Sequence, residues 1–288
     1  PQAEYPYNEL TEVNQHRDNK VPEYEVVDTR AFDENRYWDI EAEYAKTGPS
    51  DIHIRISVTN HGPETASINI LTQLWIRNTW TWICEIEQQL KKPTIKLDPN
   101  GHLIANHEVL SEFGFYAREE PNKWLFTENE TNRGRLYQAE NESPYVKDAF
   151  HNYIIHGDTN CINPDNTGTK AAAHYLLKVR PGKTKQLCYR LAATTEFSPK
   201  KKPFARTKTV FEKCIAEAAH FYSAIIDQHL SADDRAIQRQ AYAGLLQSKQ
   251  FYHYSVRDWL AGDPTQPSAP KKRVRNSDWK HLYNRDVV

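Results

Sequence analysis

The stretch from Leu74 to Trp82, LWIRNTWTW, is a dense group of side chains suited to binding a ligand. Trp75, Trp80 and Trp82 supply flat apolar faces, and Arg77 and Asn78 supply hydrogen-bond donors. A pyranose ring has an apolar C–H face and a rim of hydroxyl groups, so aromatic planes beside such donors are suited to binding it. The same pattern fits a twisted β core with aromatic cross-strand pairs, and the sequence leaves both explanations open.

A second aromatic and polar set lies near the C-terminal end, in DWKHLYNRD. Its candidate sugar-binding side chains are Trp279, His281, Tyr283, Asn284 and Asp286. They occupy a segment without clear helical or strand periodicity, so burial in a core explains them less readily. With Trp80 and Arg77, these five residues are the predicted substrate-binding residues.

Other kinds of catalytic site find little support in the sequence. The chain has no P-loop, dinucleotide-binding glycine pattern, HExxH or GxSxG motif. Its 12 histidines never combine at short spacing with a third ligand, and its 4 cysteines form no CxxC pair. We therefore predict no metal, no cofactor and free thiols. Four acidic residues between positions 127 and 170 are candidates for paired-carboxylate catalysis or simply solvated loop charges: Glu128, Glu130, Asp148 and Asp158. No residue is assigned as catalytic.

The elements that must position these residues are predicted to be mainly β-strands. DIHIRISVTN (51–60) and TASINILTQLWIR (65–77) are β-branched runs joined by HGPE, which predicts an antiparallel hairpin. A half-buried strand is expected from Arg36 onward, after an irregular arm over residues 1–30 that contains Pro6 and Pro22. Further strands are expected at 81–86, 94–97, 103–109, 113–117, 124–126, 172–179 and 185–192. This spacing predicts an antiparallel β-sandwich.

Helices are predicted only after a basic, proline-containing linker at 198–208. An amphipathic pattern covers 208–230, and a second helix is expected to run without a break over 233–261, from an N-cap at Ser231 to a stop at Gly262. The apolar residues of the second helix are too widely spread for one stripe, so it requires partners on more than one side. Without them, Phe251, Trp259 and Leu260 would be exposed or would lean on the sandwich. The remaining residues read as an extended loop, and the segment 127–170 is too long for a passive connection.

Composition limits the kinds of partner. The 37 basic and 38 acidic residues nearly cancel, so we expect no nucleic acid and no acidic membrane surface as a partner. No stretch approaches the roughly 20 apolar residues of a membrane span, and no signal peptide precedes the first strand, which favours a cytoplasmic protein. The chain begins at Pro1 and contains no methionine. We therefore expect an internal fragment of a longer protein.

Ten stretches carry a resemblance to a known family: YPYNELTEVN, PEYEVVDT, FDENRYWDIEAEYAK, IRISVTNHGPE, LWIRNTWTW, LFTENETN, SPYVKDAFH, GTKAAAHY, QRQAYAGLLQSKQFYHYSV and DWKHLYN. Over essentially its whole length the chain resembles the large microbial glucosidases related to glycoside hydrolase family 63, also described as six-hairpin glycosidase-like proteins. The resemblance implies an N-terminal β-sandwich domain, a helical linker and an (α/α)6 barrel. It also implies hydrolysis of α-glycosidic bonds with inversion, by one carboxylic acid and one carboxylate.

The expected organisation follows from these patterns and this resemblance. Residues 1–197 are predicted to form the β-sandwich domain, 198–231 the linker and linker helix, and 232–288 the beginning of an incomplete (α/α)6 catalytic barrel. The expected function is that of a fragment of an inverting α-glucosidase-like enzyme, inactive alone, with a carbohydrate substrate and the missing barrel of the same polypeptide as partners. The alternative is a non-catalytic carbohydrate-binding or purely structural β-sandwich module.

Overall fold

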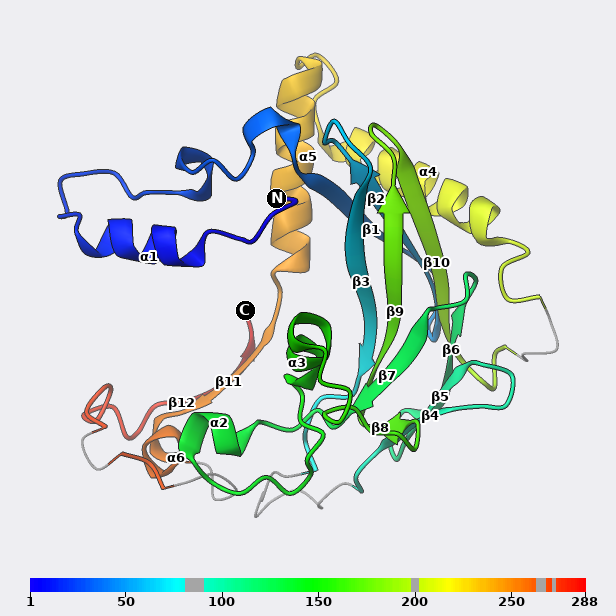
Figure 1. Ribbon diagram of the computed structural model, residues 1–288. Helices are drawn as coiled ribbons and strands as arrows, with labels where there is room; N and C mark the ends of the chain where they lie inside the picture. The colour runs from blue at the N-terminus through cyan, green and yellow to red at the C-terminus, as the bar shows by residue number, and fades with distance from the viewer. Residues whose placement is uncertain (81–90, 198–201, 263–267, 271–272) are drawn as a thin grey trace.

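The computed structural model describes residues 1–288 except 81–90, 198–201, 263–267 and 271–272 (Figure 1). The strands are β1 (Trp38–Gly48), β2 (Asp51–Asn60), β3 (Ala66–Trp75), β4 (Thr94–Leu97), β5 (Leu103–His107), β6 (Ser111–Ala117), β7 (Lys123–Thr127), β8 (Thr167–Gly168), β9 (Lys170–Val179), β10 (Thr184–Ala193), β11 (Phe251–Ser255) and β12 (Tyr283–Val287). The α-helices are α1 (Tyr7–Gln15), α2 (Arg133–Tyr137), α3 (Ala149–His156), α4 (Thr207–Ile225), α5 (Ala232–Gln247) and α6 (Val256–Ala261), and two 3-10 turns lie at Val26–Asp28 and Asp33–Asn35.

Two antiparallel sheets form the body of the fold. The larger has the order β1-β2-β10-β6-β5-β4-β8 and the smaller the order β3-β9-β7. Alternate residues of most of these strands point into one core between the sheets, because side chains along a strand alternate between its two faces. The core includes Val58, Phe115, Leu187 and Tyr189 from the larger sheet and Ile70, Phe126, Ala173 and Tyr175 from the smaller one. The predicted mainly antiparallel β fold with additional helices is therefore confirmed.

The predicted hairpin between residues 51–60 and 65–77 is wrong. β2 pairs with β1 and β10 in the larger sheet, whereas β3 pairs with β9 in the smaller sheet. The residues between them carry the chain from one sheet to the other, and Asn60 holds this crossing by donating through Nδ2 to the carbonyl oxygens of Glu64 and Val179. β2 and β3 each bury one face in the core between the sheets, β2 from the larger sheet and β3 from the smaller one. Both therefore show the alternation that is also typical of hairpin strands.

Helices cover the outer faces of the two sheets (Figure 1). α3 packs on the smaller sheet through a cluster in which Phe150 and Ala149 meet Leu125 and Ala172. α4 lies against β1 and β2 of the larger sheet, where Phe211 is buried beneath the guanidinium of Arg55 at 4.2 Å from the ring centroid. The linker helix predicted at 208–230 is therefore present as α4.

The single helix predicted over 233–261 is wrong. α5 ends at Gln247, and the next residues form β11, which pairs with β12 in a two-stranded ribbon, before the short helix α6. Phe-Tyr-His-Tyr, the start of β11, is rich in aromatic residues that favour strands. The predicted extended loop at the C-terminal end therefore contains a strand. Phe251 is exposed, and Trp259 and Leu260 are partly buried. The packing of an (α/α)6 barrel is not seen in the described residues.

Two further segments depart from the predictions. Residues 7–15 of the expected irregular arm form α1, which starts directly after Pro6, a position where proline is compatible with a helix. The long segment after β7 contains α2 and α3 instead of loop alone. The strand predicted at 81–86 lies outside the described residues. Among the described helices, none is both long enough and apolar enough to cross a membrane.

Candidate functional site

A polar network surrounds the indole of Trp80. The side chain is only 6% exposed, and its Nε1–H donates to Oε1 of Glu130 at 3.0 Å. Lys92 Nζ lies 2.8 Å from the same oxygen and 3.3 Å from Oε2 of Glu128. Thr169 completes the group by donating to Glu128 Oε2 at 2.7 Å. The network joins the end of β7 to the chain before β4 and to the residue between β8 and β9.

The electrostatics of this network indicate a charge-compensated cross-link. Burial would lower the pKa of Lys92, but the hydrogen bond and charge of Glu130, together with the charge of Glu128, outweigh burial and raise it. The two carboxylates therefore share an ammonium group and accept further hydrogen bonds. Such an arrangement holds three segments together and leaves neither carboxylate without a partner.

The other two acidic candidates of the long segment are also engaged. Asp148 accepts from Arg135 Nη1 at 3.1 Å and from the amide of Asn132 at 3.2 Å. Asp158 accepts from the backbone N–H of Asn160 at 2.9 Å, as in a local turn. The structure therefore places all four acidic candidates in local hydrogen-bond networks. In the part of the chain that the structure describes, no group of three or more His, Cys, Asp or Glu side chains could hold a metal ion.

The two described tryptophans of the LWIRNTWTW stretch, Trp75 and Trp80, differ in exposure. Trp75 is 55% exposed, whereas Trp80 is buried in the network described above. Trp82 lies outside the described residues. Trp80 therefore presents no open ring face on which a sugar could stack. Of the described tryptophans in this stretch, Trp75 is the exposed one. Arg77 lies beyond the end of β3, on the rim of the cavity described below.

The predicted C-terminal set is distributed around the β11–β12 ribbon. Trp279 and His281 have ring centroids 5.7 Å apart, and Trp279 is 56% exposed. Tyr283 contacts His253 across the ribbon, with Oη and Nε2 separated by 3.1 Å. Asn284 and Asp286 lie opposite Tyr254 and Tyr252, on the other face, because paired residues share a face and the faces alternate. Strand β12 therefore places Tyr283 on one face of the ribbon and Asn284 and Asp286 on the other, although the five predicted residues are close together in the sequence.

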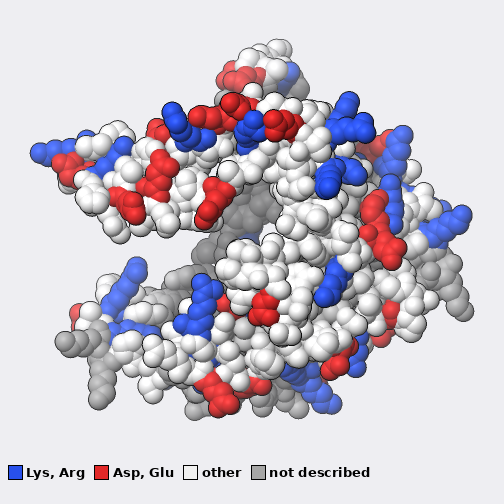
Figure 2. Space-filling model, in the orientation of Figure 1, with Lys and Arg blue, Asp and Glu red and all other residues white. Residues whose placement is uncertain are grey.

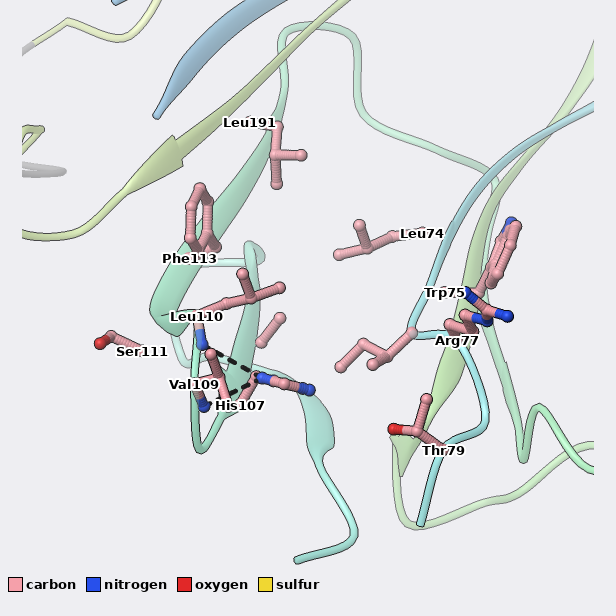
Figure 3. Close-up of a pocket in the computed structure, with 12 residues that line it drawn as sticks. Leu74, Trp75, Arg77, Thr79, His107, Val109, Leu110, Ser111, Phe113 and Leu191 are labelled. Carbon is pink, nitrogen blue, oxygen red and sulfur yellow. Dashed lines mark hydrogen bonds between the residues drawn. The ribbon is translucent and has the colours of Figure 1, made fainter. Parts of the chain in front are cut away.

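A cavity of about 520 Å³ opens between the two sheets at one end of the sandwich. Its walls are apolar, and Figure 3 shows Leu74 facing Leu110, Phe113 and Leu191 across the space. His107, at the end of β5, extends from the same side as Leu110. We call this space the intersheet cavity. Sequence analysis missed it because its walls combine residues of β3, of the β5–β6 hairpin and of β10, three parts that are distant from one another along the chain.

A buried ion pair lies where the sandwich meets the residues leading to α4. Arg190 donates through Nε and Nη2 to both carboxylate oxygens of Asp51, at 2.8 and 2.6 Å, and through Nη1 to the carbonyl of Pro203 at 3.0 Å. Its guanidinium also lies 3.9 Å from the ring centroid of Phe197. Burial alone would raise the pKa of Asp51, but the hydrogen bonds and charge of Arg190 lower it. Arg190 of β10 is therefore tied both to β2, through Asp51, and to the residues leading to α4, through Pro203.

The face of the molecule drawn in Figure 2 carries charges of both signs. In the view of Figure 2, basic and acidic side chains are interspersed over the sandwich and over the helices. This distribution accords with the near balance of 37 basic and 38 acidic residues in the chain.

Comparison with known proteins finds similarity to a longer yeast protein. No family model matches the chain. It is 32% identical over 330 aligned residues to the uncharacterized protein YMR196W of Saccharomyces cerevisiae, an alignment that covers 99% of this chain and 30% of the yeast protein. The chain thus spans about 30% of the length of this relative. Among solved structures, "Putative kojibiose phosphorylase from human microbiome" aligns with 76% of this chain and 22% of its own, at 9% identity and a TM-score of 0.26. A likeness this weak carries no inference about activity.

Proposed function

We propose that this chain is the β-sandwich and linker portion of a larger enzyme that hydrolyses α-glycosidic bonds with inversion, related to glycoside hydrolase family 63. The sandwich would support a helical catalytic barrel, and the substrate would be a carbohydrate. The resemblance of ten stretches along the chain supports this proposal. The yeast relative, of which the chain spans 30%, supports only a place in a longer polypeptide and says nothing of the activity.

The exposed apolar surface of α5 is the observation that supports the helical part of the proposal. This helix has no buried residue, and Ile237, Leu245 and Leu246 are 58%, 67% and 52% exposed. Apolar helix surface of this kind is usually buried against other helices. α4 is seated on the sandwich, and the cation of Arg239 on α5 lies 4.9 Å from the ring centroid of Tyr222 on α4. We infer that further helices of the same polypeptide pack on α5.

The catalytic acid and base are proposed to belong to that barrel. An inverting glycosidase requires two carboxyl groups about 6.5–9.5 Å apart, with space for a water molecule between the sugar and the base. The four acidic candidates between positions 127 and 170 are instead bound to nearby donors, as described above. We therefore assign them a supporting role and assign no catalytic residue in this chain.

An activity assay tests the proposal. A polypeptide extended to the length of the yeast relative and the 288-residue chain would each be incubated with α-linked glucose disaccharides of every linkage. Release of glucose would be measured, and proton NMR would identify the anomer formed first. We expect β-glucose from the longer protein and no turnover by the 288-residue chain. Turnover by the 288-residue chain, or α-glucose as the first product, would contradict the proposal.

A second candidate function is carbohydrate binding by the β11–β12 ribbon. It is favoured by the exposed ring of Trp279, which lies beside His281 and close in sequence to Tyr283. Calorimetric titration of the 288-residue chain with gluco-oligosaccharides would test it. Binding that is lost in Trp279→Ala but retained in Trp75→Ala, which alters another exposed tryptophan, would support the ribbon as a binding surface. Equal losses, or no binding, would argue against it.

A further inference from the structure

The intersheet cavity is an apolar space with few polar groups in its walls. It is about 520 Å³, within the range of about 300–1,000 Å³ that is typical of sites for small organic ligands. Leu74 of β3 and the nearby Ile76 face it from one side, and Ala105, Phe113 and Leu191 face it from the larger sheet. The side chains of Trp75 and Arg77 point away from the cavity in Figure 3. The lining residues all belong to the described chain.

The hairpin between β5 and β6 forms part of the mouth. Its loop covers residues 108–110 and leads into Ser111, the first residue of β6, whose backbone is left-handed with a φ of 65°. The loop residues Val109 and Leu110 are 67% and 61% exposed, although both also line the cavity. Apolar side chains in this position would gain burial from a molecule that fills the cavity and reaches its mouth.

His107 has a defined tautomer. Its Nδ1 accepts hydrogen bonds from the backbone N–H groups of Val109 and Leu110, each at 3.1 Å (Figure 3). An acceptor nitrogen carries no proton, so the neutral ring must carry its proton on Nε2. Figure 3 shows that this second nitrogen points away from the loop, toward the space between the sheets. The local turn thus aims a single N–H donor at an apolar cavity.

The polar groups that line the cavity favour a neutral ligand. Besides His107, they include the hydroxyl group of Thr79, whereas the Ser111 hydroxyl and the Arg77 guanidinium point away from the space in Figure 3. Moving a carboxylate out of water into an apolar space without a cation beside it is costly. A hydroxyl or carbonyl oxygen can instead accept from a neutral imidazole N–H at much lower desolvation cost.

We propose that the intersheet cavity binds a small neutral amphiphile. Its apolar chain or ring would lie among Leu74, Phe113 and Leu191, and its hydroxyl or carbonyl oxygen would accept a hydrogen bond from Nε2–H of His107. This site is separate from the proposed glycosidase chemistry and does not depend on it.

Calorimetric titration of the 288-residue chain at pH 7.5 with 1-octanol and with octanoate tests the proposal. We expect saturable binding of 1-octanol and binding of octanoate at least about tenfold weaker, because only octanoate must bury a charge. His107→Asn is the matched variant for the donor. The Asn Oδ1 can replace Nδ1 as acceptor for the loop N–H groups, but the variant lacks the ring N–H that reaches into the cavity. It should bind 1-octanol about tenfold more weakly, the effect of one net hydrogen bond.

Two further variants locate the site. Ala105→Leu places additional atoms in the cavity and should abolish binding, whereas Ile215→Ala, at an exposed position on α4, should leave it unchanged. If Ala105→Leu does not fold, methyl NMR of the unaltered chain replaces it, and octanol should shift the signals of Leu74, Ala105 and Leu191. The proposal is overturned by absence of saturable octanol binding, by unchanged binding in Ala105→Leu or His107→Asn, by tighter binding of octanoate than octanol, or by methyl shifts confined to other residues.

Discussion

The buried ion pair between Asp51 and Arg190 gives a sharp prediction about stability. Both side chains are largely buried, with 13% and 14% of their surfaces exposed. Asp51→Asn keeps the shape of the side chain but leaves the Arg190 guanidinium without its anionic partner. Removing one member of a buried pair costs about 3–5 kcal/mol, because the remaining charge stays desolvated. Since some solvent reaches both groups, we expect a loss near the lower limit, about 3 kcal/mol.

Urea unfolding followed by tryptophan fluorescence would measure this loss at pH 7. In thermal unfolding, the same loss of about 3 kcal/mol would lower the Tm of a domain of this size by roughly 6–12 °C. The matched control is Glu212→Gln, which breaks the Lys208–Glu212 pair on α4, whose side chains are 89% and 62% exposed. An exposed pair of this kind contributes at most about 1 kcal/mol.

The pH dependence provides a second check. The pKa of Asp51 is lower in the folded chain than its usual value, so the unfolded chain binds its proton more readily. The stabilisation is therefore complete above the unfolded pKa of about 3.9 and is lost as the pH falls through the folded pKa. The difference between the unaltered chain and Asp51→Asn should shrink below about pH 4. If Asp51→Asn is no more destabilising than Glu212→Gln at pH 7, the reasoning is refuted.

Three other predictions concern the helices and one turn. Phe211→Ala should destabilise the chain by about 3 kcal/mol, because it removes a ring that is 3% exposed beneath Arg55. Ile215→Ala, at an exposed position on the same helix, should change stability little. Urea titration of both variants distinguishes the buried contact from helix propensity. Burial and the charge of Lys123 lower the pKa of His174, so the contribution of the neutral ring to stability is present above about pH 6.5 and is lost at lower pH. His174→Gln should therefore reduce the drop in the free energy of unfolding between pH 7.5 and 5.5. An unchanged drop would contradict this assignment. Ser111→Gly should raise stability by about 1 kcal/mol in thermal unfolding, because glycine adopts a φ of 65° without strain, and a decrease would show that the Ser111 side chain outweighs that strain.

Most strands were predictable because alternation is a local property. β1, β4, β7, β9 and β10 lie within a few residues of their predicted positions. Their partners were not predictable. β2 and β3 are adjacent in sequence and show the alternation of a hairpin, yet they contribute to opposite sheets. Alternation fixes which face of a strand is buried, and strands of either sheet satisfy that requirement equally.

The helical part shows the limit of local patterns more clearly. Ser231 was correctly predicted as the N-cap of α5, and its Oγ accepts from the N–H of Asp234 at 3.1 Å. The end of that helix was missed because β11 is stabilised by pairing with β12, about 30 residues farther along the chain. Apolar residues spread around a helix and apolar residues alternating on a strand look alike over a short window.

The candidate sites divide in the same way. The sequence identified Trp80 as notable, but its side chain is buried and hydrogen-bonded to Glu130, whereas Trp75 is exposed. The intersheet cavity had no signal in the sequence, since four separate strands form its walls.

By itself the sequence determined the mainly antiparallel β character of the chain, the approximate positions of most strands and the beginnings of both long helices, because each depends on neighbours within a few residues. Only the tertiary structure decided which strands pair, which tryptophan reaches solvent and how His107 is oriented toward a cavity. These features depend on contacts between residues that are distant along the chain, and such contacts form only when the two sheets pack together.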